Sequence, residues 1–143
     1  PRIRPLLREL GIGLVPFSPL GRGFLAGTAR RAEEYPETDY RRRDPRYAGE
    51  SFDANVRAAD AVRVLARRKD ATPAQIALAW LLAKGDDVVP FPGTKRRTFL
   101  EENVGAAGVN LTAAEVAALE AVLPDGKAAG ERYAPELARF IDR

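Results

Sequence analysis

The sequence predicts a helix-rich α/β fold. Two short apolar runs share one pattern, Leu14-Val15-Pro16-Phe17 and Val88-Val89-Pro90-Phe91, and both are typical of buried strands. Two segments with helical periodicity separate these runs, which favours a parallel strand–helix arrangement. The chain has 143 residues, of which 45% are hydrophobic and 30% charged, so one domain with a buried core is expected.

The composition excludes several kinds of chemistry. The chain has no Cys and no His, so it has no disulfide, no thiolate zinc site and no Ser-His-Asp triad, and we predict no metal site. A net charge of +3 is too small for a dedicated nucleic-acid surface. No apolar run approaches the roughly 20 residues that span a bilayer, and no secretory signal pattern opens the chain. We therefore expect a cytoplasmic protein with neither a nucleic-acid nor a membrane partner.

The first half of the chain contains a short helix and a long loop. Residues 3–10 place apolar side chains on one helical face, and Gly11 ends that helix. A strand at about 14–17 follows, and then a polar, turn-rich loop over 18–51. Loops of this length are usually functional or disordered. The arginines from Arg41 to Arg46 either hold a phosphate or form a solvated surface beside acidic neighbours.

Helices dominate the remainder, with the second strand at about 88–91. Thr72 and Thr112 are expected N-caps, with Pro73 in the first helical position and Glu115 completing a capping box. Asp53 is expected to be an N-cap or first-turn acid. The predicted helices cover about 53–69, 73–84, 97–105, 112–122 and 134–141.

Each expected strand is followed by a loop that suits a ligand. The segment from Pro92 to Arg97 leads from the second strand into a helix, where free N–H groups and the helix dipole favour phosphate. The segment from Phe17 to Gly23 follows the first strand and contains two glycines. Parallel strands bring both loops to the same end. Each loop taken alone is also typical of an ordinary solvated turn, and that interpretation stays open.

Taken together, these segments resemble the aldo-keto reductases. Residues 11–25 resemble the seventh strand of that family and the loop after it, and residues 72–82 resemble the helix before the eighth strand. Residues 89–96 with 100–103 resemble the eighth strand, its nucleotide-binding turn and the next helix. The resemblance implies the C-terminal part of a TIM (β/α)8 barrel, with two barrel strands plus C-terminal helices. It also implies hydride transfer between NADP(H) and an aldehyde or ketone in the complete enzyme.

The resemblance also implies which residues bind the cofactor. The loop after Phe17 would flank the pyrophosphate and nicotinamide, and the turn at Lys95 would hold the adenosine end with its 2′-phosphate. Phe99 departs from the family pattern, because many relatives carry Arg or Gln there. The implied cofactor-binding residues are Phe17, Ser18, Leu20, Gly21, Gly23, Gly93, Thr94, Lys95, Arg97, Glu102 and Asn103.

The family's catalytic Asp, Tyr, Lys and His match no position of this sequence. We therefore expect no catalytic residue here and no activity from this chain by itself. The missing N-terminal barrel half would be its partner, supplied by the same polypeptide or by another chain. One alternative is a non-catalytic NADP-binding or interaction module resembling potassium-channel β subunits. Another is a remnant that binds nothing.

Overall fold

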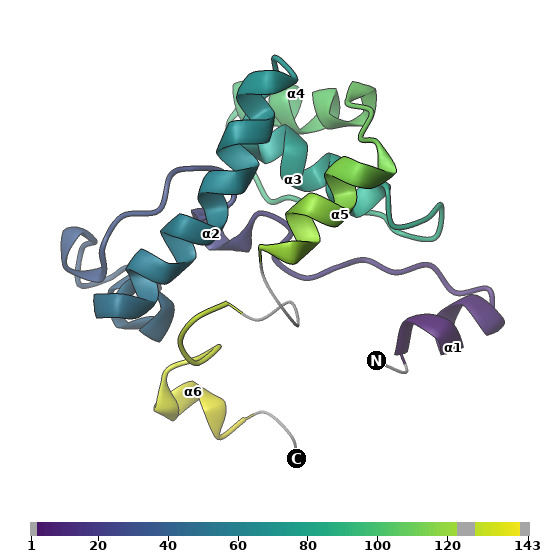
Figure 1. Ribbon diagram of the computed structural model, residues 1–143. Coiled ribbons are helices and arrows are strands. Elements are labelled where there is room, and N and C mark those ends of the chain that lie inside the picture. The colour runs from purple at the N-terminus through teal and green to yellow at the C-terminus, as the bar shows by residue number, and fades with distance from the viewer. Residues whose placement is uncertain (1–2, 123–127, 141–143) are drawn as a thin grey trace.

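Four helices form the main body of the molecule. In the computed structural model, which describes residues 3–122 and 128–140, these helices gather on one side (Figure 1). The helices α1 (Ile3–Glu9) and α6 (Pro135–Ala138) lie apart from them, near the two ends of the chain. The body consists of α2 (Gly49–Arg68), α3 (Pro73–Leu82), α4 (Arg97–Gly105) and α5 (Ala113–Ala121).

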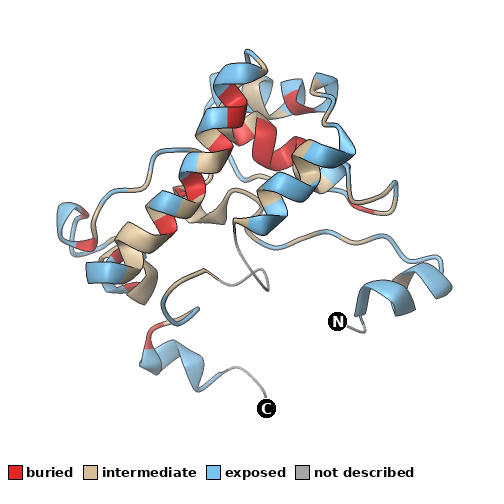
Figure 2. Cartoon of the chain, in the orientation of Figure 1, coloured by how far each residue is buried: buried red, intermediate tan, exposed pale blue. Residues whose placement is uncertain are grey.

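The body encloses its core between α2 and α3. Figure 2 shows the buried residues concentrated on these two helices. Val62 and Leu65 of α2 pack with Ile76 of α3, whose side chain is fully buried. Leu119 of α5 packs against the same cluster. Removal of these apolar groups from water holds the three helices together.

The long loop is a packed part of the structure. Four short 3-10 turns run along it, η1 (Gly21–Gly23), η2 (Ala32–Glu34), η3 (Tyr40–Arg43) and η4 (Pro45–Tyr47). Tyr47 is completely buried, and its ring centroid lies 4.7 Å from that of Phe24 and 5.7 Å from that of Tyr35. This aromatic cluster fastens the loop to the first half of α2, where Phe52 joins it.

The helix after the loop begins earlier than the sequence indicates. It starts at Gly49, where the expected start is near residue 53. Asp53 consequently lies beyond the first turn, so its assignment as a cap or first-turn acid is wrong. Its carboxylate instead pairs with Arg31 of the loop at 2.5 Å. This long-range ion pair has no signal in the local sequence.

The two expected strands are reduced to one parallel bridge. Leu14 pairs with Val88, with the Leu14 N–H donating to Asp87 O at 2.6 Å and the Val89 N–H donating to Leu14 O at 2.9 Å. The prediction of parallel pairing is confirmed, but strands over 14–17 and 88–91 do not form. Pro16 and Pro90 have no N–H to extend the ladder. No further strand flanks the pair among residues 3–122 and 128–140.

Two predicted helix starts are confirmed in detail. The Thr72 hydroxyl accepts the Gln75 N–H at 3.2 Å, with Pro73 in the first helical position. The Thr112 hydroxyl accepts the Glu115 N–H, also at 3.2 Å, and the Glu115 carboxylate accepts the Thr112 N–H. The last expected helix, 134–141, is shorter in the structure, and its residue 141 lies outside the described residues.

None of the helices described here combines the length and apolar character needed to cross a membrane.

Candidate functional site

A groove of about 760 Å³ lies between the two loops that follow the parallel bridge. One wall comes from the loop at Ser18–Gly23, and the other comes from Pro92–Lys95 and the α4 residues from Phe99 to Asn103. The bridge between Leu14 and Val88 places the two loops side by side. The groove thereby collects these predicted site residues: Ser18, Leu20, Gly23, Gly93, Lys95, Glu102 and Asn103.

Four predicted site residues lie outside this lining. Phe17 and Gly21 border a neighbouring cavity on the other side of the Ser18 loop. The Thr94 hydroxyl accepts the Arg96 N–H within its own turn, at 3.1 Å. Arg97 donates to Glu101 across one turn of α4 at 2.7 Å. The geometry therefore separates the expected set into groove residues and residues with local partners.

The start of α4, which adjoins the groove, has no side-chain cap. Arg96 is the N-cap but makes no side-chain cap, and no acidic residue occupies the first turn. The first N–H groups of such a helix carry a partial positive charge and favour an anion. A Cβ added to Gly93 would meet nothing within 4 Å, so a ligand can approach the backbone there. Lys95, which is exposed, adds a full positive charge beside this turn.

Gln75 holds α4 in place against α3. Its Oε1 accepts the Thr72 N–H at 3.0 Å, and its Nε2 donates to Glu102 O at 3.1 Å. A Cβ on Gly105 would lie 2.6 Å from Gln75 Nε2, so a larger residue there would displace the Gln75 amide. This positioning role of Gln75 was not predicted from the sequence. The only available signal was the spacing of Thr72 and Gln75, which is that of a capping box.

Two further groove residues, Tyr40 and Arg41, come from the middle of the long loop. Arg41 donates to both carboxylate oxygens of Asp39, at 3.0 and 2.6 Å, and these hydrogen bonds lower the pKa of Asp39 to about 2. Burial raises the pKa of Tyr40. Neither residue was singled out for this site, because only the folding of the loop over the groove brings them there.

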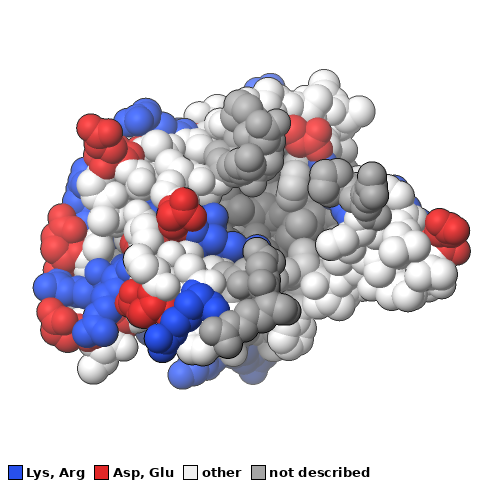
Figure 3. Space-filling model, turned by 90° about the horizontal axis from the view of Figure 1, so that it is seen from below, with Lys and Arg blue, Asp and Glu red and all other residues white. Residues whose placement is uncertain are grey.

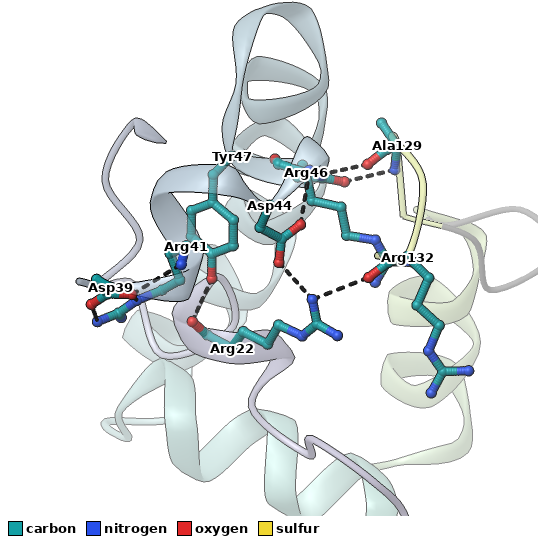
Figure 4. A network of polar contacts seen from close by, with 9 residues as sticks. Arg22, Asp39, Arg41, Asp44, Arg46, Tyr47, Ala129 and Arg132 are labelled. Carbon is teal, nitrogen blue, oxygen red and sulfur yellow. Dashed lines mark hydrogen bonds and ion pairs between the residues drawn. The ribbon is translucent and has the colours of Figure 1, made fainter. Parts of the chain in front are cut away.

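A polar network holds the Ser18 loop against the rest of the molecule (Figure 4). Tyr47 Oη donates to Arg22 O at 2.5 Å, and Arg22 Nη1 donates to Asp44 Oδ2 at 2.5 Å and to Arg132 O at 3.1 Å. Ser18 and Arg22 have φ values of +52° and +57°, a region that non-glycine residues rarely adopt. Such conformations persist only when surrounding contacts impose them, and they concentrate at functional sites.

Both walls of the groove lie in a part of the chain that matches a known protein family. The family model described as "Aldo/keto reductase family" matches residues 1–124, which include both walls of the groove. The chain belongs to the aldo/keto reductase family.

Individual aldo/keto reductases are similar over most of the chain. The aldo-keto reductase yakc of Schizosaccharomyces pombe, whose name specifies NADP(+), is 44% identical over 90% of this chain. Probable aldo-keto reductase 1 of Glycine max is 44% identical over 96%, and aldo-keto reductase str7 of Strobilurus tenacellus is 38% identical over 94%. The matches cover 38%, 40% and 40% of the relatives' own lengths. The chain thus spans about two fifths of each relative.

The charged groups of this aldo/keto reductase chain include a small set at the groove. Within 3–122 and 128–140, no three His, Cys, Asp or Glu side chains are grouped to hold a metal ion. The charged side chains at the groove are Arg22, Arg41, Lys95 and Glu102. Arg22 and Arg41 are paired with Asp44 and Asp39, whereas Lys95 appears in no ion pair among the described residues, so its end of the groove suits an anionic group such as a phosphate.

Proposed function

We propose that this chain is the cofactor-holding, C-terminal segment of an NADP(H)-dependent aldo-keto reductase barrel that acts on an aldehyde or ketone. The observation that carries the proposal is the groove itself. It is lined both by the Ser18 loop and by the turn that carries the positive charge of Lys95. These two segments are about seventy positions apart in the sequence. The name of the yakc relative, which specifies NADP(+), supports the choice of cofactor.

The residues divide between the two ends of the dinucleotide. Lys95 and the free N–H groups at the start of α4 would hold the 2′-phosphate of the adenosine end, with Glu102 and Asn103 toward the adenine. The glycines and Ser18 of the opposite wall would lie along the pyrophosphate and nicotinamide. When bound, the cofactor supplies the hydride for a carbonyl carbon. Residues outside this sequence would supply the proton to the carbonyl oxygen.

The remainder of the barrel would cover the apolar surface around the bridge. Val15, Phe17, Val89 and Phe91 are 63%, 68%, 58% and 77% exposed, although they flank the paired residues. Figure 3 shows charged side chains crowded over one part of the surface and few of them at the end that carries α1. Two paired segments cannot close a barrel. We infer that the N-terminal barrel half, from the same polypeptide or from another chain, packs here.

Lys95→Ala tests the proposed cofactor site. If the ammonium contacts the 2′-phosphate, the Kd for NADPH should rise about tenfold or more, because a charge-assisted contact is lost. The Kd for NADH, which has no 2′-phosphate, should change far less. Titration calorimetry with both dinucleotides measures the two constants, and Arg68→Ala on the exposed end of α2 is the control. Equal losses for both dinucleotides would reject the assignment, whereas NADPH binding without turnover in the complete protein would favour the non-catalytic alternative.

A further inference from the structure

A second cavity, of about 390 Å³, lies beside the groove on the far side of the Ser18 loop. Its walls come from that loop, from η4 and the first half of α2, and from the segment 128–132 near the C-terminal end. The cavity and the groove share Ser18 and Arg22. The cavity and the groove therefore lie on the two sides of one loop.

The cavity is lined by three arginines and by no described Asp or Glu. They are Arg22, Arg46 and Arg132, each from a different segment. Asp44 lies behind them, pairing with Arg22 at 2.5 Å and accepting the backbone N–H of Arg46 at 3.0 Å. One carboxylate offsets one of the three positive charges, so the cavity retains an excess of positive charge.

Arg46 contributes a half-buried guanidinium to this cavity. Its Nε is buried and has no hydrogen-bond partner among the described residues. Burial lowers the pKa of Arg46, and the nearby charges of Arg22 and Arg132 lower it further. A buried N–H donor without a partner is costly to the folded state, and an anion in the cavity would accept a hydrogen bond from it.

Arg132 completes the set from the C-terminal segment. Arg22 Nη1 donates to the backbone carbonyl of Arg132 at 3.1 Å, and this hydrogen bond does not involve the Arg132 side chain. The guanidinium lies over the rings of Phe17 and Tyr133, with centroid distances of 5.7 and 5.6 Å. Aromatic faces orient an arginine while leaving its N–H donors available to a carboxylate.

We propose that this arginine-lined cavity binds a carboxylate carried by the carbonyl substrate, with Arg46 and Arg132 as the specificity-determining residues. The proposal rests on the reductase function inferred above. The shared Ser18 loop places the cavity next to the part of the groove assigned to the nicotinamide. A substrate with an anionic tail would then have its carbonyl group at the cofactor and its carboxylate among the arginines.

The test compares two aldehydes of equal carbon number with the complete protein from its source. Arg46→Gln should raise the KM for 4-oxobutanoate, which carries a carboxylate, about tenfold, because a charge-assisted hydrogen bond is lost. The KM for uncharged butanal and the Kd for NADPH should stay within about twofold. Arg132→Gln should also raise the KM for 4-oxobutanoate. Because Arg132 is exposed, this variant provides the test if Arg46→Gln impairs folding. Arg57→Gln, an equal charge change on the exposed face of α2, is the control and should change neither KM.

Other results would contradict either the substrate proposal or the reductase function on which it rests. A raised Kd for NADPH together with equal losses for both aldehydes would assign the cavity to a cofactor phosphate and overturn the proposal. Unchanged constants in both variants would also overturn it. Failure of the unaltered protein to reduce butanal with NADPH would overturn the reductase function, and the substrate proposal with it.

Discussion

The Asn55 side chain connects three segments of the chain, although no sequence pattern indicates this role. Its side chain is buried on α2 and donates to Arg46 O at 3.2 Å and to Ala129 O at 3.0 Å. Its Oδ1 accepts the Ala129 N–H at 2.8 Å. One amide group therefore fastens both η4 and the C-terminal segment that supplies Arg132.

Asn55→Ala should release that segment. Loss of the amide leaves the backbone groups of Ala129 and Arg46 without these partners, which should lower the free energy of unfolding by about 1–3 kcal/mol. Proteolysis within residues 128–140 should accelerate more than proteolysis elsewhere. Urea unfolding and limited proteolysis measure the two effects, and Arg57→Ala on the exposed face of α2 is the control. Equal acceleration throughout the chain would show general destabilisation and contradict the fastening role.

Sequence patterns located much of the candidate site because it is built from two local motifs. Ser18, Gly93 and Lys95 could be predicted, since each follows a short apolar run at a glycine-containing turn. Tyr40 and Arg41 could not, because their approach depends on how the long loop folds. The packing of Tyr47 against Phe24 is likewise a long-range effect without local periodicity.

At the scale of elements, one ion pair connects the end of α2 to the start of α5. Lys69 Nζ lies 2.8 Å from Glu115 Oε2 and also donates to Asn110 O at 3.0 Å. Hydrogen bonds from Lys69 and from the Thr112 backbone lower the pKa of Glu115 from 4.5 to about 2. The carboxylate thus serves both as a cap and as a connection between helices.

This arrangement predicts an acid-sensitive contribution to stability. A carboxyl whose pKa is lower in the folded state stabilises the fold above its unfolded pKa, near 4.5, and that contribution disappears as the pH falls toward 2. Glu115→Gln should therefore reduce the loss of unfolding free energy between pH 5 and about 2. Urea titrations across this range measure the slope, with Glu50→Gln at the exposed start of α2 as the control. An unchanged slope in Glu115→Gln would contradict the assignment.

Helices could be predicted better than strands for a physical reason. The hydrogen bonds of α3 and α5 are internal, and their starts are marked by Thr72 and Thr112. The pairing of Leu14 with Val88 needs a neighbour distant in sequence, and further pairing needs more strands. The apolar pattern over 14–17 and 88–91 therefore predicted where pairing occurs but not how far it extends.

At the scale of the whole molecule, packing and exposure divide the chain. Helices α2, α3 and α5 share a buried core, whereas the bridge and α1 expose large apolar side chains, among them Ile3 at 70% and Phe91 at 77%. Apolar groups placed this way around a paired segment favour association with further strands. The chain belongs to the aldo/keto reductase family and spans about two fifths of each relative.

Hydrogen–deuterium exchange on the protein from its source, with and without NADPH, tests the central claim most directly. We predict slow exchange at the non-proline amides of 14–17 and 88–91, because neighbouring barrel strands would pair with them. We also predict that NADPH slows exchange at 18–23, in one wall of the groove, and at 93–97, which comprise the turn of the other wall and the start of α4. Rapid exchange in all four segments, unchanged by NADPH, would contradict both the barrel and the cofactor site.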